Sequence, residues 1–154
     1  MRRHICASVG TLWLCCAASA ATPPLGFYIA YSKAAPGLHE VECRDFSTPG
    51  YIREKPDFPI TRVEDIRIEV YPHQRNPTKL VFRFTPEDAK AFAAFTARRG
   101  EVRLFLMFGS EPLAEYGFIA RVLTRELLVG LPPGSDPQKL KQQLQAFVVK
   151  PDET

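Results

Sequence analysis

The residues best suited to chemistry lie together in the stretch His39-Glu40-Val41-Glu42-Cys43. Imidazole, thiolate and carboxylate groups are the usual ligands of zinc, and a structural zinc site needs four of them around one centre. On an extended strand, however, side chains alternate between two faces, so His39 and Cys43 point one way while Glu40 and Glu42 point the other. The stretch therefore indicates an ordinary strand, and we expect no metal site and no cofactor.

Acid–base or nucleophilic chemistry has few other candidates. Glu111 and Glu115 could act as an acid–base pair, although acidic residues beside a turn are common on surfaces. Ser110 stands in the sequence Phe-Gly-Ser-Glu-Pro, which lacks the G-x-S-x-G pattern of hydrolase nucleophiles. His73 falls in a turn, where a solvated role is expected. The sequence predicts no catalytic residue, and a small hydrolase using Glu111, Glu115 or His39 is kept as an alternative.

The N-terminus has the pattern of a secretory signal peptide. Arg2 and Arg3 precede an apolar run over residues 5–18, and an A-x-A pattern ends at Ala20. The apolar run is about 14 residues long, whereas a helix that spans a bilayer needs about 20. We expect residues 1–20 to be removed on export, with an uncleaved anchor as the alternative.

Removal of this segment changes the charge and the cysteine count. The 20 basic residues become 18 against 17 acidic ones, which leaves a net charge of +1 and no basic run for a nucleic acid. Cys6, Cys15 and Cys16 are removed, so Cys43 is left alone and no internal disulfide is expected. Cys43 is expected to be a buried thiol, with a reactive or partner-linking role as the alternative.

Hydrophobic periodicity places the strands that would carry these residues. Alternation of apolar and polar residues predicts strands, and proline and glycine mark the turns between them. Residues 65–71 and 79–84 alternate well on both sides of a short turn, which predicts a β-hairpin. Further strands are expected at 26–32, 38–46, 101–108, 114–123 and 126–131, with an irregular, proline-rich connection at 47–61.

A first helix is predicted after the hairpin. Thr85 stands at the N-cap position, Pro86 at the first helical position, and Glu87 and Asp88 near the positive end of the helix dipole. Gly100 is expected to end this helix. Its apolar stripe consists of Ala89, Phe92, Ala93 and Thr96, with Phe95 at the edge.

A second helix is predicted at residues 137–147. Ser135 or Asp136 is expected to cap it, and Leu140, Leu144 and Phe147 form its apolar stripe. Strands, helix, strands and helix thus follow one another along the chain. This order predicts an α+β fold, in which two helices pack on one face of a mostly antiparallel sheet.

The residues Glu87, Ala89, Phe92 and Thr96 follow the pattern E-x-A-x-x-F-x-x-x-T, and Gly100, an apolar strand, a tight turn and another strand come next. This arrangement resembles the periplasmic P1 region of SecD, an export-associated membrane protein, and especially its head subdomain. The resemblance covers about residues 50–148. It includes the preceding segment, where Thr61, Asp65 and Ile66 are similar to the family's T-x-x-D-I entry but have one more residue between Thr and Asp, and the final helix.

The chain also departs from that family. The Asp of the family's Asp-Gly turn is missing, although Gly109 is kept, and the transmembrane helices with their proton-conducting carboxylates are absent. The resemblance implies transient contact with polypeptide that emerges into the periplasm. We therefore expect the following divisions: signal peptide 1–20, N-terminal strands and loop 21–49, head-like domain 50–149 and tail 150–154.

Phe105 and Met107 are the candidate binding residues, because they alternate away from the main apolar face of their strand. The alternative is a second face covered by the N-terminal strands. The favoured function is a non-enzymatic, periplasmic or secreted module that binds extended polypeptide or a protein partner. An accessory subunit of the envelope or of secretion, which oligomerises through an exposed edge strand, is the other hypothesis.

The signal peptide gives a direct test. N-terminal sequencing of the exported protein should begin near Ala21 or Thr22, because signal peptidase cleaves after the A-x-A pattern. A full-length product in the membrane fraction would contradict this prediction.

Overall fold

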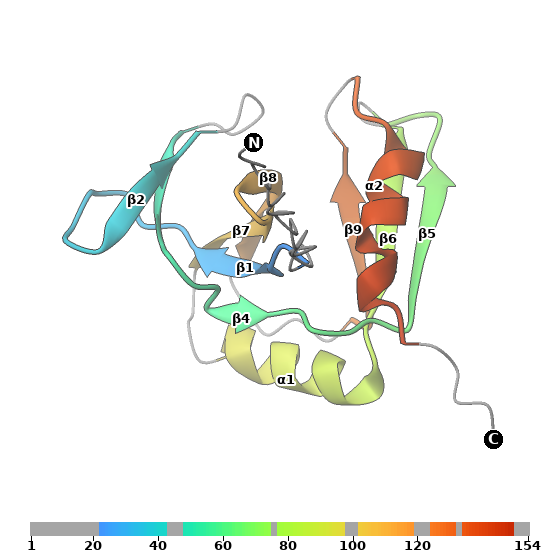
Figure 1. Ribbon diagram of the computed structural model, residues 1–154, viewed down its shortest axis with the longest axis horizontal. Helices are drawn as coiled ribbons and strands as arrows, with labels where there is room; N and C mark the ends of the chain where they lie inside the picture. The colour runs from blue at the N-terminus through green and yellow to red at the C-terminus, as the bar shows by residue number, and fades with distance from the viewer. Residues whose placement is uncertain are drawn as a thin grey trace, which may run out of the picture.

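Antiparallel pairing of short strands builds most of the molecule. The computed structural model describes residues 22–42, 48–74, 77–97, 102–118, 124–131 and 134–149. Within these ranges the strands form a four-stranded sheet in the order β4-β1-β7-β8, a two-stranded sheet β2-β3, and a three-stranded sheet β5-β6-β9 (Figure 1). The strand bounds are β1 Leu25–Ile29, β2 Leu38–Val41, β3 Gly50–Arg53, β4 Phe58–Pro59, β5 Asp65–Val70, β6 Thr78–Arg83, β7 Val102–Phe108, β8 Glu111–Phe118 and β9 Glu126–Gly130.

The predicted hairpin is confirmed. In β5 and β6, Ile66 lies opposite Phe82 and Ile68 opposite Leu80, so both strands turn their apolar side chains to the same face. Strand β9 pairs with the other edge of β6. The turn between β7 and β8 contains Gly109 at a φ of 60°, a left-handed conformation that favours glycine.

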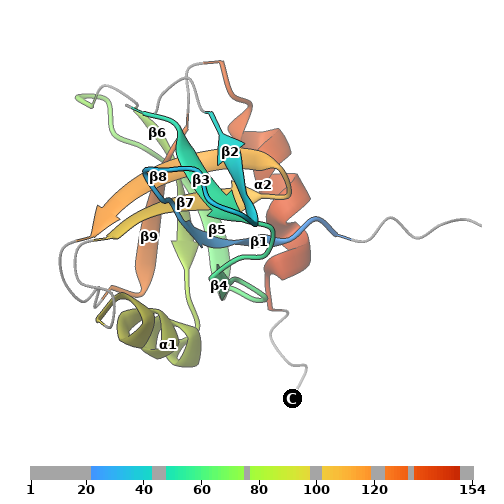
Figure 2. The same ribbon diagram turned by 90° about the vertical axis from the view of Figure 1, so that its left-hand side faces the viewer.

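The proline-rich connection was expected to be irregular, and this prediction was wrong in part. Within it, β3 pairs with β2, and β4 pairs with one edge of β1. The other edge of β1 pairs with β7, far along the chain. The strands therefore divide among three sheets, and the two-stranded sheet lies across the four-stranded one (Figure 2).

Helix α1 spans Pro86–Ala97 and has the predicted cap. The Asp88 amide donates to the Thr85 hydroxyl oxygen at 3.2 Å, and that hydroxyl donates to the Asp88 carboxylate at 2.8 Å. The buried residues are Phe92, Ala93 and Thr96, as the apolar stripe predicts. The expected stop at Gly100 lies outside the described residues.

Helix α2 spans Pro137–Leu144 and continues as a 3₁₀ turn, η1, over Gln145–Phe147. Of the two predicted caps, Asp136 accepts from the Gln138 and Lys139 amides at 3.0 and 3.1 Å. Leu140 and Leu144 turn inward. The α+β class is confirmed, with α2 over the three-stranded sheet and α1 below β4 (Figure 1). No helix in the described ranges is long and apolar enough to cross a membrane.

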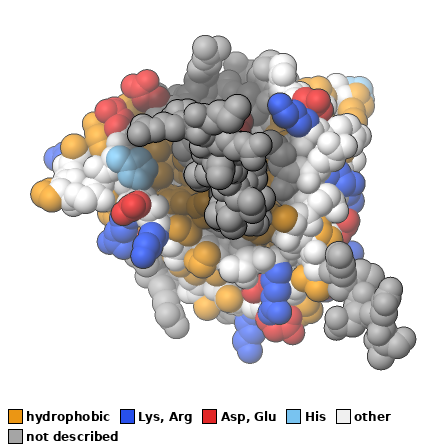
Figure 3. All heavy atoms as spheres, viewed as in Figure 1, with side chains coloured by type: hydrophobic (Ala, Val, Ile, Leu, Met, Phe, Trp, Pro, Cys, Tyr) orange, Lys and Arg blue, Asp and Glu red, His pale blue; other side chains and the backbone are white. Residues whose placement is uncertain are grey.

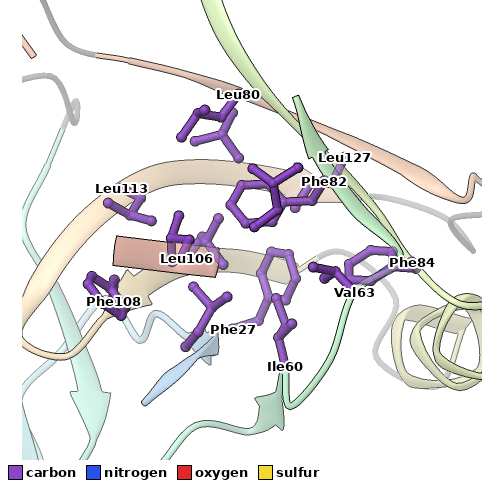
Figure 4. Packing of buried hydrophobic residues seen from close by; sticks show 14 of the residues in the cluster. Phe27, Ile60, Val63, Leu80, Phe82, Phe84, Leu106, Phe108, Leu113 and Leu127 are labelled. Carbon is purple, nitrogen blue, oxygen red and sulfur yellow. The ribbon is translucent and has the colours of Figure 1, made fainter. Parts of the chain in front are cut away.

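The main core lies between the four-stranded and three-stranded sheets (Figure 4). Phe92 links the two sheets to α1, because its ring centroid is 4.7 Å from that of Phe27 on β1 and 5.6 Å from that of Phe84 after β6. Phe58 of β4 completes the group at 5.2 Å. Aromatic side chains in such arrangements dominate the energetics of a core.

Two substitutions in α1 test this description of the core. Phe92→Ala should lower the free energy of unfolding by roughly 3–5 kcal/mol, because it leaves a cavity among packed rings. Thr85→Ala should lower it by about 1 kcal/mol, because one capping acceptor is lost. Urea melts of both variants measure the difference. A smaller loss for Phe92→Ala than for Thr85→Ala would mean that the buried face is assigned wrongly.

Candidate functional site

The two candidate binding residues lie on the second face of the four-stranded sheet, beneath the β2–β3 hairpin. Phe105 is 0% and Met107 2% exposed, and they form a smaller hydrophobic cluster with Tyr28, Val41 and Ile52. The alternative in which the N-terminal strands cover this face is therefore the one that the structure shows. Binding at these two residues stays a prediction, and direct contact with Phe105 would require the hairpin to move.

Arg103 holds the hairpin against the sheet. Its guanidinium carbon lies 4.8 Å from the centroid of the Phe105 ring. The same guanidinium donates to the backbone oxygens of Thr48 and Pro49, just before β3, and to the Glu115 carboxylate on β8. One side chain thus joins β7, β8 and the start of the hairpin's second strand.

Beside this cluster lies an open groove of about 570 Å³. Its buried lining consists of Tyr28, Val41, Ile52 and Met107. Gly109, Ser110 and Pro112, at the β7–β8 turn, also line it. His39, Glu40, Glu42 and Glu54 line it as exposed residues. On this side of the molecule, charged and hydrophobic side chains lie close together over β2 (Figure 3).

Strand β2 presents an unpaired backbone edge along the groove. Tyr51 of β3 exchanges both backbone hydrogen bonds with Tyr31, at 2.9 and 3.0 Å. Its amide and carbonyl therefore point away from β2, and Glu40 lies directly opposite Tyr51. In an antiparallel ladder, both members of such a pair point their amides and carbonyls outward. The Glu40 amide and carbonyl consequently face the free edge, and no hydrogen bond joins them to another described residue.

Tyr28 adds a polar atom to the apolar lining of the groove. Its side chain is 3% exposed, and its hydroxyl makes no hydrogen bond to any described residue. Burial, and then the negative charge of Asp57, raise the pKa of Tyr28 above its ordinary value. The hydroxyl therefore stays protonated at neutral pH and can donate to a ligand.

The structure does not bring together Glu111 and Glu115, the alternative acid–base pair. Glu115 lies opposite Phe105, and Glu111 opposite Phe108, so a register shift between Leu106 and Met107 puts the two carboxylates on opposite faces of the sheet. His73 is exposed. Among the described residues, no cluster of three or more His, Cys, Asp or Glu side chains could hold a metal ion, and Cys43 lies outside them.

Glu69 and Glu126, two surface carboxylates with lowered pKa values, belong to an ion cluster on the outer face of the three-stranded sheet. The sequence pattern did not predict this cluster. Arg67 pairs with Glu69 at 2.6 Å and with Glu126 at 3.0 Å, and the Tyr71 hydroxyl also donates to Glu69. The hydrogen bond from Tyr71, and then that from Arg67, lower the pKa of Glu69, and Arg67 lowers that of Glu126. Carboxylates held ionised by such partners are suited to structure rather than to proton transfer.

Comparison with known proteins identifies the fold. No family model and no curated protein matches the chain. Two solved structures do: a crystal structure of SecDF in its super-membrane-facing form, and a structure of SecDF as a membrane component that enhances protein export. The first has a TM-score of 0.57 and 16% identity over 81% of this chain, and the second 0.56 and 13% over 82%.

These matches cover 18% and 61% of the SecDF chains, so this chain spans only part of either. At such low identity the likeness concerns the fold alone. The chain therefore has a SecDF-like fold, in agreement with the resemblance inferred from the sequence. The assignment to the P1 head subdomain remains a prediction.

Gly50 provides a test of how the hairpin is seated. A Cβ atom at this position would lie 2.6 Å from the ring of Phe105, a side chain that is 0% exposed. Gly50→Ala should therefore destabilise the domain and speed hydrogen exchange of the β2 and β3 amides. Gly117→Ala is the matched control, because it adds the same methyl group to another strand with nothing within 4 Å. Equal exchange in both variants would contradict the proposed packing.

Proposed function

We propose that this SecDF-like fold is an exported, non-enzymatic module that binds extended polypeptide in the periplasm. The observation that carries the proposal is the unpaired edge of β2 beside an apolar groove. An extended chain can add to such an edge as a further strand, with backbone hydrogen bonds that do not depend on its sequence. Alternate side chains of that strand would then enter the groove.

The groove offers a place for those side chains. Val41 and Met107 supply apolar surface, and the Tyr28 hydroxyl supplies a donor where a ligand's backbone or polar side chain would lie. Met107 thus keeps the role expected from the sequence, as part of the lining. Phe105 supports it from below, because the two residues belong to one buried cluster.

The likeness to SecDF supports a setting in protein export. One of the similar structures is described as a membrane component that enhances protein export. The helix pattern from Glu87 to Thr96 favours a head-like module of the P1 type. Export of this chain rests on the N-terminal pattern of charge and hydrophobicity.

The accessory-subunit hypothesis makes use of the same structural feature. An unpaired edge can pair with the edge of a second copy as readily as with a peptide. The two hypotheses predict different effects when the β2 edge is blocked. The binding module would lose affinity for a peptide, whereas the accessory subunit would lose its oligomeric mass in solution.

Glu40→Pro tests the proposed function. Proline removes the outward amide of this residue while the β2–β3 ladder, which does not use it, is kept. In an NMR titration with an uncharged extended peptide that alternates apolar and polar residues, shifts should cluster on β2 and near Met107. Affinity should be micromolar or weaker, about −8 kcal/mol at best. Glu40→Pro should abolish the shifts, and Glu40→Ala, which keeps the amide, should preserve them.

Two further results would decide between the hypotheses. Unchanged binding by Glu40→Pro, or no binding by any extended peptide, would contradict the proposal. A concentration-dependent mass that Glu40→Pro reduces to that of a monomer would favour the accessory subunit. Met107→Asp should also weaken binding, but it places a charge in a buried cluster and is therefore the less specific variant.

A further inference from the structure

The charged residues around the groove all have the same sign. Glu40, Glu42 and Glu54 line it, and no Lys or Arg does so among its described lining residues. None of the ion pairs between described residues involves these three carboxylates. An apolar groove with an acidic rim is therefore complementary to a segment that is both apolar and basic.

The nearest arginines on these strands are engaged elsewhere. Arg53 of β3 pairs with Asp57 at 3.3 Å and lies over the Tyr31 ring, where its guanidinium carbon is 5.8 Å from the centroid. Arg103 is bound to Glu115 and to the backbone before β3. Neither side chain neutralises the rim, so its negative potential extends into the groove.

From these observations we infer that the groove selects extended segments in which basic and apolar residues alternate, an inference that rests on the proposed function. Side chains alternate along a strand, so Glu40 and Glu42 lie on one side of β2, and His39 and Val41 on the other. A segment paired with β2 repeats this alternation, and directly opposite residues share a side. Two lysines or arginines separated by one residue would then face Glu40 and Glu42, and the residue between them would face Val41 and Met107.

The order of basic and apolar residues in the ligand matters as well as its net charge. A segment with the same residues shifted by one position would put its apolar side chains against the carboxylates and its charges against Met107. Burial of an unpaired charge in the apolar lining is unfavourable. The positions of the charges in the ligand therefore determine the register in which it pairs with β2. The backbone hydrogen bonds of the β2 edge do not depend on the ligand's sequence.

Synthetic peptides of one length and one apolar composition test this inference. Three peptides carry Lys, Gln or Glu at the positions that alternate with apolar residues, and a fourth carries the same residues as the Lys peptide in blocks. At low ionic strength, fluorescence anisotropy should show the alternating Lys peptide bound roughly three- to tenfold more tightly than the Gln peptide, as two exposed ion pairs allow. The Glu peptide and the blocked peptide should bind more weakly than the alternating Lys peptide, and added salt should remove its advantage.

The matching variant replaces the rim carboxylates with Glu40→Gln, Glu42→Gln and Glu54→Gln together. It should lose the preference for the Lys peptide, so that the Lys and Gln peptides bind equally. The control carries Glu87→Gln and Asp65→Asn, which neutralise exposed carboxylates outside the groove, and it should behave like the natural protein. Equal binding of the Lys, Gln and Glu peptides by the natural protein would overturn the inference and leave the proposed function standing. Absence of binding by all peptides would overturn both.

Discussion

The antiparallel pairing of β1 with β7 is the contact on which the other parts of the structure depend. It joins a strand near the N-terminus to one from the second half of the described chain, and it makes the four-stranded sheet two-sided. On one side, Phe27 and Leu106 enter the main core between the sheets. On the other, Tyr28 and Met107 lie under the β2–β3 hairpin and beside the groove. A sheet without β1 would lose Phe27 from the core and Tyr28 from the lining of the candidate site.

The parts of the fold that sequence patterns predicted well are those in which the signal is local. The β5–β6 hairpin alternates over its whole length, and the caps at Thr85 and Asp136 depend on residues three positions apart or fewer. The pairing of β1 with β7 has no such signal, because any apolar strand can occupy that place. β3 and β4 escaped prediction for a related reason. Their prolines and charges read as a loop, and only their long-range partners make them strands.

The candidate site was predictable only in part. Alternation singled out Phe105 and Met107 as a second apolar face, but it could not show that a hairpin would cover both. Nor could it show which edge of that hairpin stays unpaired, since this follows from the exchange of hydrogen bonds between Tyr31 and Tyr51. Glu111 and Glu115 show the same limit. Their spacing left an acid–base pair open as an alternative, and a single β-bulge places them on different faces of the sheet.

The two hydrophobic clusters differ in size, and this difference bears on how the molecule opens. The smaller cluster consists of five buried residues and seals the hairpin to the sheet, whereas the larger joins both sheets and both helices. Regions with fewer buried contacts open at lower free energy than the rest of a protein. We therefore expect the hairpin to open at lower free energy than the main core. A ligand bound to the edge of β2 would stabilise the form in which the hairpin is packed on the sheet. Ligand binding would therefore reduce local opening of the hairpin.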